Sequence, residues 1–251
     1  MLELLTSPDA WIAFFTLTAL ELVLGIDNIV FISVLVDRLP KEQRELARRI
    51  GLFLAMFMRI GLLLILSWLV GLTRPLFELF GHGYSGRDLF LIGGGLFLLW
   101  KSTREIHFLL EGEEGDGSAK AGATFGSVIF QIIIIDMVFS FDSIITAVGM
   151  VDELAVMVAA VVVAVALMMV FAGPVGRFVS AHPTIKMLAL SFLVLVGMVL
   201  VADGFGHHVP KGYIYFAMAF SCCVELLNLR MKKPAKPVQL HERYVSEDNG
   251  G

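Results

Sequence analysis

The chain has 251 residues, of which 57% are hydrophobic and 17% charged, and its mean hydropathy is +0.83. This composition argues against an ordinary soluble globular protein and is typical of a polytopic membrane protein in contact with the lipid bilayer. The net charge of −4 offers no basic surface for nucleic acid, so we expect no nucleic-acid partner.

Several apolar stretches approach the roughly 20 residues that a membrane-spanning helix needs. They number seven and lie at residues 11–36, 50–72, 89–110, 125–150, 154–171, 185–202 and 213–229. The third is the weakest, because its apolar part is short and Lys101, Arg104 and Glu105 follow it. We expect this helix to end early or to place those charges at the membrane interface. The fold class predicted is an all-α membrane protein with seven transmembrane helices.

The Lys and Arg residues between the stretches orient the bundle. With the N-terminus outside, 15 of them fall on the cytoplasmic side and 3 on the outer side, while Arg59 lies within a stretch. Because cytoplasmic loops carry the excess of basic residues, we expect the N-terminus outside and the C-terminus in the cytoplasm. The localisation predicted is the bacterial inner (plasma) membrane.

Two stretches, one in the first predicted span and one in the fourth, repeat one pattern. The first reads ELVLGIDNI and the second DMVFSFDSI. Each has two carboxylates six residues apart, a small residue between them, and an amide or hydroxyl directly after the second. The polar positions are Glu21, Asp27 and Asn28 in the first motif and Asp136, Asp142 and Ser143 in the second.

The spacing of the two motifs predicts an internal repeat. Three spans make one unit, and three is odd, so the second unit enters the membrane from the opposite face, as in many secondary transporters. The seventh span is an addition. The organisation predicted is a first three-helix repeat at 1–110, a flexible cytoplasmic linker at 111–124, a second, inverted repeat at 125–202, a seventh transmembrane helix at 203–231 and a disordered cytoplasmic tail at 232–251.

Acids inside a membrane need a cation or a proton. A charge at the centre of a spanning helix costs roughly 2.5–3.5 kcal/mol, and Glu21 and Asp136 each lie about 15 Å into their predicted spans. We expect Arg59 to pair with one acid, although it cannot neutralise all four, and we consider Lys101 a second charge partner or gate. The remaining acids are then available to protons or to a metal.

The donor atoms of both motifs are oxygens. Oxygen-rich sites suit Mg²⁺, Ca²⁺ or Mn²⁺ rather than Zn²⁺ or Cu⁺. The metal ligands predicted are Glu21, Asp27, Asn28, Asp136, Asp142 and Ser143. Metal entry can displace protons from such a site, so proton exchange is a natural form of coupling. We expect a transported divalent cation and no permanently bound cofactor.

Three further predictions concern small residues in the apolar stretches. Gly25 and Ser140 lie between the paired acids, and we expect the helices to unwind there and expose carbonyl groups to a cation. The run Gly93-Gly94-Gly95 predicts close helix packing rather than a phosphate loop. Cys222 and Cys223 are interpreted as buried apolar filler.

The motifs resemble those of the TerC family of bacterial integral membrane proteins. The similarity is carried by ELVLGIDNIVFIS, by DMVFSFDSIITAVG and by the basic stretch before GLFLAMFMR, and it extends over residues 11–229. The family, named for tellurium resistance, is similar in design to the LysE group of exporters with inverted three-span repeats. The resemblance implies efflux of Mn²⁺, with the two acidic motifs as its metal-binding positions. It also implies a link, in some members, to metal loading of secreted proteins.

Several functions remain to be separated. The leading hypothesis is a transporter that exports a divalent cation, most favourably Mn²⁺, and is not an enzyme. The alternative is a metal-binding accessory membrane protein, for tellurium resistance or metal loading, that acts beside secretion machinery or as a homo-oligomer without moving ions. An intramembrane aspartyl protease is disfavoured, because Asp27 follows Ile26 and Asp142 follows Phe141 where those enzymes have Tyr-Asp and Gly-x-Gly-Asp. A proton or anion channel is a further, weaker alternative.

Overall fold

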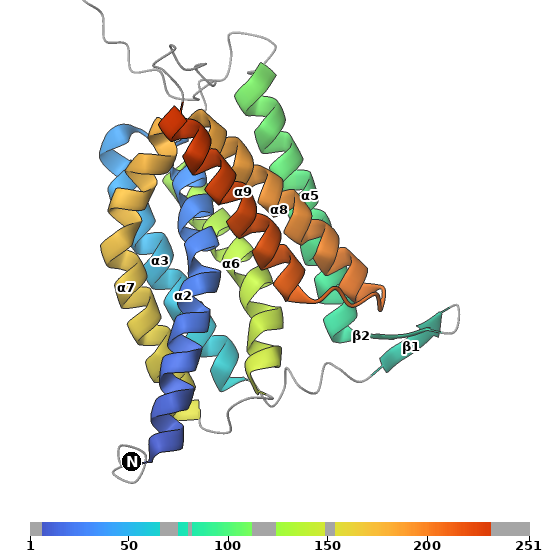
Figure 1. The fold of residues 1–251 in the computed structure, drawn as a ribbon. Coiled ribbons are helices and arrows are strands. Elements are labelled where there is room, and N and C mark those ends of the chain that lie inside the picture. Colours follow the sequence, from blue (N-terminus) through green and yellow to red (C-terminus); the bar gives the residue numbers. More distant parts are fainter. Residues whose placement is uncertain (1–6, 66–74, 80–81, 112–123, 149–153, 232–251) are drawn as a thin grey trace, which may run out of the picture.

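The computed structural model describes residues 7–65, 75–79, 82–111, 124–148 and 154–231. These residues are mainly helical, and the long helices lie together as one bundle with the start of α2 at one end (Figure 1). The helices are α2 (Pro8–Val36), α3 (Lys41–Leu64), α5 (Gly86–Glu111), α6 (Phe125–Val148), α7 (Leu154–Ala181), α8 (Pro183–Gly204) and α9 (Lys211–Met231). The all-α prediction is therefore confirmed in outline.

Among these helices, three are long and apolar enough to cross a bilayer. They are α7, α8 and the segment Gly212–Met231 of α9, and α6 contains a shorter apolar stretch, Phe125–Phe141. Large apolar side chains also cover the outside of the bundle, for example Val170 and Phe216, which are 69% and 72% exposed. An exterior of this kind fits contact with lipid. That all seven helices span the membrane stays a prediction.

The helices pack in three main pairs. α2 lies along α7, α3 along α6 and α5 along α8. In the α5–α8 pair the backbones approach closely, because a Cβ atom on Gly95 would lie 2.6 Å from the carbonyl oxygen of Gly197. A Cβ atom on Gly94 would lie 2.8 Å from Val138 of α6, whereas Gly93 has open space beside it. Close packing is thus confirmed for two glycines of the run.

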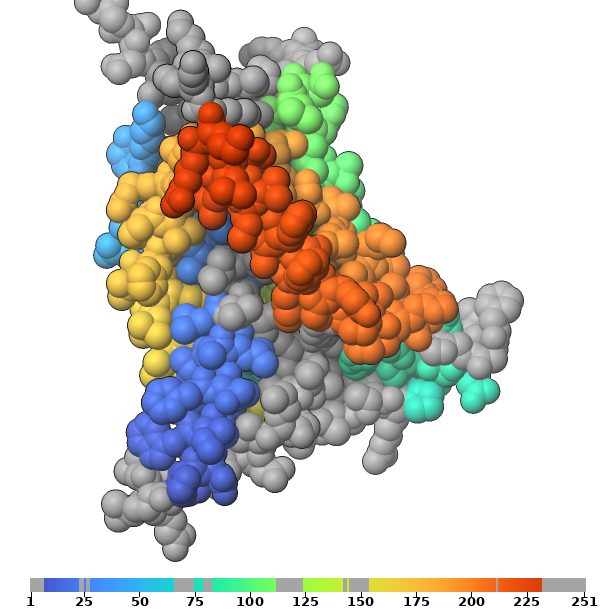
Figure 2. All heavy atoms as spheres, viewed as in Figure 1, coloured from blue at the N-terminus to red at the C-terminus, as the bar shows by residue number. Residues whose placement is uncertain are grey.

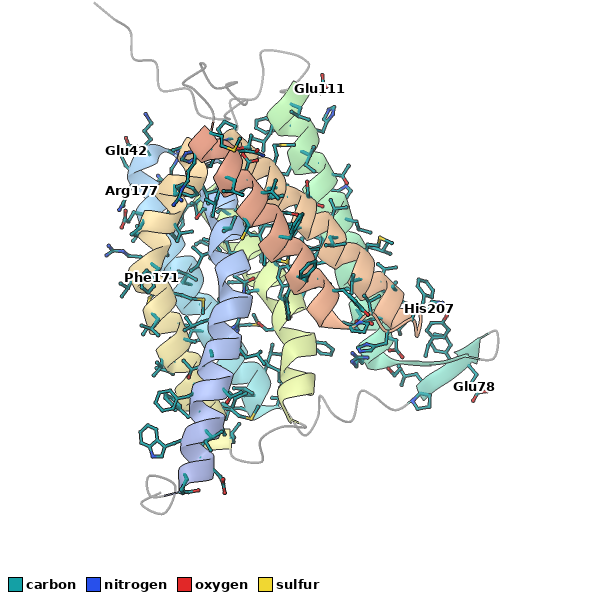
Figure 3. The ribbon with its side chains drawn as sticks, viewed as in Figure 1. Glu42, Glu78, Glu111, Phe171, Arg177 and His207 are labelled. Carbon is teal, nitrogen blue, oxygen red and sulfur yellow. The ribbon has the colours of Figure 1, made fainter. Side chains whose placement is uncertain are left out.

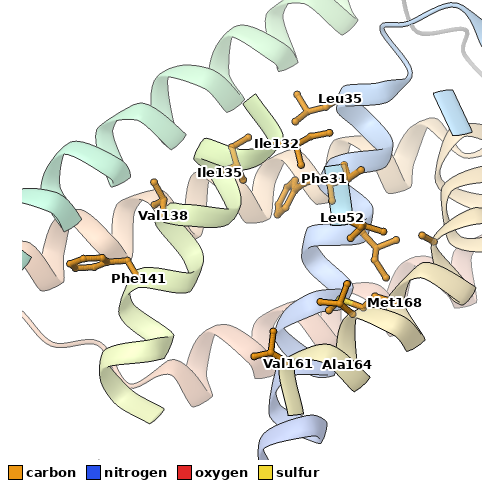
Figure 4. Packing of buried hydrophobic residues seen from close by; sticks show 14 of the residues in the cluster. Phe31, Leu35, Leu52, Ile132, Ile135, Val138, Phe141, Val161, Ala164 and Met168 are labelled. Atoms are coloured by element: carbon orange, nitrogen blue, oxygen red, sulfur yellow. The ribbon is translucent and has the colours of Figure 1, made fainter. Parts of the chain in front are cut away.

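The apolar core forms where α2, α6 and α7 meet. Figure 4 shows Phe31 and Leu35 on α2 facing Ile132 and Ile135 on α6, with Met168 of α7 nearby. All five side chains are buried. They surround the segments of α2 and α6 that carry the acidic motifs, so the acids lie beside a tightly packed core.

A small hairpin between α3 and α5 was not predicted from the sequence. Strands β1 (Pro75–Leu79) and β2 (His82–Ser85) pair in antiparallel fashion, with Phe77 opposite Tyr84. The rings of this pair stack with centroids 5.6 Å apart. The segment is too short and too mixed in polarity to stand out from a loop, and only the cross-strand pairing makes it a hairpin.

The third predicted span does not end early. α5 continues to Glu111, and it buries Lys101 and Glu105 while Arg104 stays exposed, with its guanidinium 5.6 Å from the centroid of the Trp100 ring. Two of the three charges are therefore buried in the bundle, and their position at the membrane interface stays a prediction. Charged partners elsewhere in the bundle, described below, compensate the charge of Glu105.

The helix α9 lies on the outside of the bundle next to α8 (Figure 2). Both Cys222 and Cys223 are exposed on it, so the interpretation of these residues as buried filler is wrong. An apolar helix that contacts the bundle along one neighbour leaves most of its side chains to lipid, and Cys is apolar enough for that position. The predicted tail at 232–251, and residues 112–123 of the predicted linker, lie outside the described residues.

Candidate cation site

Helix α2 presents one buried row of polar and small residues. Glu21 and Asn28 are seven residues apart, which places them on one face of a helix about two turns apart. Both are buried, with 9% and 5% of their surfaces exposed. Gly25 lies between them, and Thr18 lies one turn before Glu21. The row therefore brings a carboxylate, an amide and a hydroxyl to the interior of the bundle.

Helix α6 supplies Asp136, the most connected carboxylate of the site. Asn28 donates a hydrogen bond of 3.0 Å from its amide nitrogen to Oδ1 of Asp136. Ser140, one turn further along α6, donates from its hydroxyl to Oδ2 at 3.2 Å. Both oxygens of this buried carboxylate thus have donors, and the first motif contacts the second directly.

Helix α3 contributes the positive charge that joins the two motifs. Arg59 donates from Nη2 to Oδ1 of Asp136 at 2.6 Å, and from Nη1 to Oε2 of Glu21. Arg59 is itself buried, with 4% of its surface exposed. One guanidinium therefore bridges acids that lie in different motifs and on different helices. Arg59 was expected to pair with one acid, and it pairs with two.

Three of the six predicted ligands come together in this arrangement, namely Glu21, Asn28 and Asp136. The side chains of Asp27, Asp142 and Ser143 lie outside the described residues, although their backbones belong to α2 and α6. Within the part of the chain that is described, no group of three or more His, Cys, Asp or Glu side chains is arranged to hold a metal ion. The described site is an ion-pair bridge of two acids and one guanidinium.

The predicted break in the two motif helices is wrong. α2 runs from Pro8 to Val36 through Gly25, and α6 runs from Phe125 to Val148 through Ser140. Gly25 serves packing instead, because a Cβ atom there would lie 2.1 Å from Sδ of Met168 on α7. Ser140 is used as a hydrogen-bond donor to Asp136. With an arginine to compensate the acids, no carbonyl groups need to be exposed.

Thr18 was not predicted as part of the site. Its hydroxyl is buried and has no hydrogen-bond partner among the residues that the structure describes. A buried hydroxyl without a partner is costly, and such atoms call for an explanation. The signal available in the sequence was its position one helical turn before Glu21, on the same face.

A second cluster of buried charges lies where α2 ends. Asp37 accepts a hydrogen bond from Ser180 of α7 at 2.8 Å and forms an ion pair with Lys186 of α8 at 2.7 Å. Arg38 pairs with Glu105 of α5. The cluster is at the same end of the bundle as Glu42, Arg177 and Glu111, whereas His207 lies at the opposite end (Figure 3).

Lys101 belongs to the surroundings of this second cluster. It is buried and lines a small cavity together with Glu105, Phe31 and Ile135. A second small cavity is lined by Asn28 and Asp136 as well as by Phe31 and Ile135. Both cavities are lined by Phe31, Leu35 and Ile135, so these apolar side chains lie between the candidate site and the buried charges at the end of the bundle.

Comparison with known proteins identifies relatives of similar length. The model of the integral membrane protein TerC family matches residues 6–239. The UPF0053 inner membrane protein YgdQ of Escherichia coli (strain K12) is 54% identical over 229 residues, which cover 91% of this chain and 96% of YgdQ. A UPF0053 protein of Haemophilus influenzae is 52% identical over 237 residues, which cover 94% of this chain and all of that protein.

Another relative is much longer than this chain. The UPF0053 inner membrane protein YoaE of Escherichia coli (strain K12) is 52% identical over 228 residues, which cover 90% of this chain and 44% of YoaE. The chain thus spans less than half the length of that relative. No solved structure matches the chain.

The family match covers nearly the whole chain, and YgdQ and YoaE are named inner membrane proteins. The apolar helices of the structure fit a multi-pass protein of that membrane. On these grounds the chain belongs to the TerC family of integral membrane proteins.

Proposed function

We propose that the protein is a transporter that exports a divalent metal cation across the inner membrane, with Mn²⁺ as the first candidate. It acts as a carrier and not as an enzyme, and the metal is its cargo rather than a resident cofactor. In this proposal all seven helices span the membrane, with the N-terminus outside and the end of α2 toward the cytoplasm.

One observation carries the proposal. Glu21 and Asp136, from two motifs on different helices, meet inside the bundle around a single positive charge. In a membrane protein, buried ionisable residues that face the bundle interior typically mark an ion pathway. Both acids already bind one cationic group, the guanidinium of Arg59, which supports a role for them in binding a cation.

The chemistry of the donors favours a hard cation. Apart from the Arg59 guanidinium, the described polar groups at the site are the carboxylates of Glu21 and Asp136, the amide of Asn28 and the hydroxyl of Ser140. Their oxygens are the ligands that Mn²⁺, Mg²⁺ and Ca²⁺ prefer. Asp27, Asp142 and Ser143 add oxygens of the same kind to the two motifs in the sequence. This donor set disfavours a thiophilic metal.

The pattern of helix packing supports an inverted repeat. In the predicted repeat, α2, α3 and α5 of the first unit correspond to α6, α7 and α8 of the second. A symmetric arrangement of the two units then requires that the contact of α2 with α7 be matched by a contact of α6 with α3, and that α5 contact its own counterpart, α8. All three contacts are main packing pairs of the structure. A cation site between two such units suits alternating access to the two sides of the membrane.

The proposal is tested by flux in proteoliposomes that contain only this protein. Mn²⁺, Ca²⁺, Mg²⁺ and Zn²⁺ are compared with and without an imposed pH gradient, which also tests proton exchange. We expect flux of Mn²⁺ to exceed flux of Zn²⁺, and Asp136→Asn to abolish it. The matched control is Glu45→Gln, because Glu45 is exposed and forms a surface ion pair with Arg49 on α3. Absence of metal flux with folded protein would refute export.

The second candidate is a metal-binding accessory protein that moves no ions. One observation favours it, namely that Arg59 already compensates both described acids. Metal binding without flux in the same proteoliposomes would select this candidate. Co-purification with secretion components, or a defined homo-oligomer, would then be the next measurements.

A further inference from the structure

The bridging arginine is bound in a way that permits its displacement. A guanidinium binds a carboxylate most strongly through two parallel hydrogen bonds. Arg59 instead donates from Nη1 to Glu21 and from Nη2 to Asp136. Its Nε is buried and has no hydrogen-bond partner within the described ranges. The arginine therefore satisfies both acids, while its own donors are incompletely used.

The charges of the bridge match a divalent cation better than they match arginine. Two carboxylates and one guanidinium leave a net charge of −1 on the described bridge. A divalent cation in the place of the guanidinium would neutralise both carboxylates. Oδ1 of Asp136 already accepts hydrogen bonds from both Arg59 and Asn28, so a metal that binds this oxygen must displace one of these donors and would meet the guanidinium charge at close range. Simultaneous binding of both cations to these carboxylates is therefore disfavoured.

We propose that Arg59 is a tethered counter-ion that competes with the transported metal for Glu21 and Asp136. The inference rests on the export function proposed above. When the metal leaves, Arg59 returns to the two acids, so that the empty site does not expose two uncompensated charges inside the membrane. An unpaired charge at the centre of a spanning helix is costly. Arg59 thus allows the empty carrier to reorient, and it limits the affinity for metal so that the metal can be released.

The test separates two kinds of transport. Net Mn²⁺ efflux into metal-free buffer requires the empty carrier to return, whereas exchange of labelled for unlabelled Mn²⁺ does not. For full-length Arg59→Gln we expect Mn²⁺ to bind about tenfold more tightly or better in calorimetry, because one competing positive charge is removed. We expect net efflux to fall at least about tenfold while exchange persists, since only the return of the empty carrier depends on the arginine.

A second variant keeps the test decisive if Arg59→Gln does not fold, since it leaves two buried carboxylates unpaired. Lys retains the positive charge, but it lacks the two separate nitrogen atoms through which Arg59 contacts Glu21 and Asp136. Arg59→Lys is therefore expected to bind Mn²⁺ several-fold more tightly than the wild type. Unchanged or weaker Mn²⁺ binding by a folded Arg59 variant, or equal loss of exchange and net efflux, would overturn the role of Arg59.

The outcomes also distinguish this inference from the proposed function. Wild-type flux together with unchanged affinity in Arg59→Gln and Arg59→Lys would leave export intact and remove only the counter-ion role. Wild-type protein that moves none of the four metals would remove both, because the counter-ion role depends on transport.

Discussion

Asn28 of α2 donates a hydrogen bond of 3.0 Å to Asp136 of α6, so the two acidic motifs are in direct contact inside the bundle. The residues are 108 positions apart, and both are buried. A hydrogen bond to a charged group contributes about 1.5–3 kcal/mol, and an unpaired buried acceptor costs a similar amount. The contact therefore both orients Asp136 and joins α2 to α6.

Removal of this contact should lower stability and metal flux together. We expect Asn28→Ala to lower the free energy of unfolding by about 2 kcal/mol, because Asp136 loses a donor. The measurement is thermal unfolding in detergent beside Mn²⁺ flux in proteoliposomes. Ser33→Ala is the control, since Ser33 is buried on the same helix but donates its hydrogen bond to the carbonyl of Ile29. Equal flux in both variants would contradict a role for Asn28 in the site.

Thr18 should affect function and stability in opposite directions. Its buried hydroxyl has no partner among the described residues, so Thr18→Val should leave stability unchanged or raise it by about 1 kcal/mol. If the hydroxyl contributes an oxygen to the transported cation, Mn²⁺ flux should fall in the same variant. Thr16→Val is the matched control, because Thr16 is exposed on α2. A clear loss of stability in Thr18→Val would show that the hydroxyl has a partner.

The close contact between α5 and α8 should tolerate no side chain. A Cβ atom on Gly95 meets the backbone of Gly197, which cannot rotate away as a side chain can. We therefore expect Gly95→Val to cost about 1–3 kcal/mol or more in thermal unfolding. Gly93→Ala, two residues earlier in open space, should be neutral or stabilising by up to about 1 kcal/mol. Similar melting temperatures for the two variants would argue against this packing.

The buried charges at the end of α2 should matter far more than surface charges. Asp37→Ala leaves the buried ammonium of Lys186 without this carboxylate, and we expect a loss of about 3–5 kcal/mol. The surface pair of Glu45 and Arg49 is more than half exposed on both sides, so Glu45→Ala should cost at most about 1 kcal/mol. Thermal unfolding of the two variants in one detergent makes the comparison. A small effect of Asp37→Ala would mean that water reaches the cluster.

The predicted orientation is open to a direct measurement. The excess of Lys and Arg predicts that the end of α9 lies in the cytoplasm. A fluorescent reporter that matures only in the cytoplasm, fused after the last residue, should therefore be bright. A periplasmic alkaline phosphatase fused at the same point should be inactive. The opposite pair of results would invert the bundle and, with it, the proposed direction of transport.

Sequence alone determined the class of this protein and the main residues of its candidate site. Long apolar stretches leave few alternatives to membrane helices, because every backbone polar group in lipid must be satisfied within the segment. Acids in those stretches stand out because burial of charge is expensive. The repeated motifs therefore identify Glu21, Asn28 and Asp136, and Arg59 stands out because it lies well inside the second predicted span.

Tertiary structure decided how those residues are used. Sequence could not reveal that Arg59 bridges two acids, because a guanidinium on α3 reaches α2 and α6 only when all three helices pack together. It also suggested a break at Gly25 that the fold replaces with close packing on Met168. Contacts between side chains far apart in the chain depend on helix crossing and rotation. No local sequence pattern encodes the crossing and rotation of the helices, and these determine which basic residue compensates which acid.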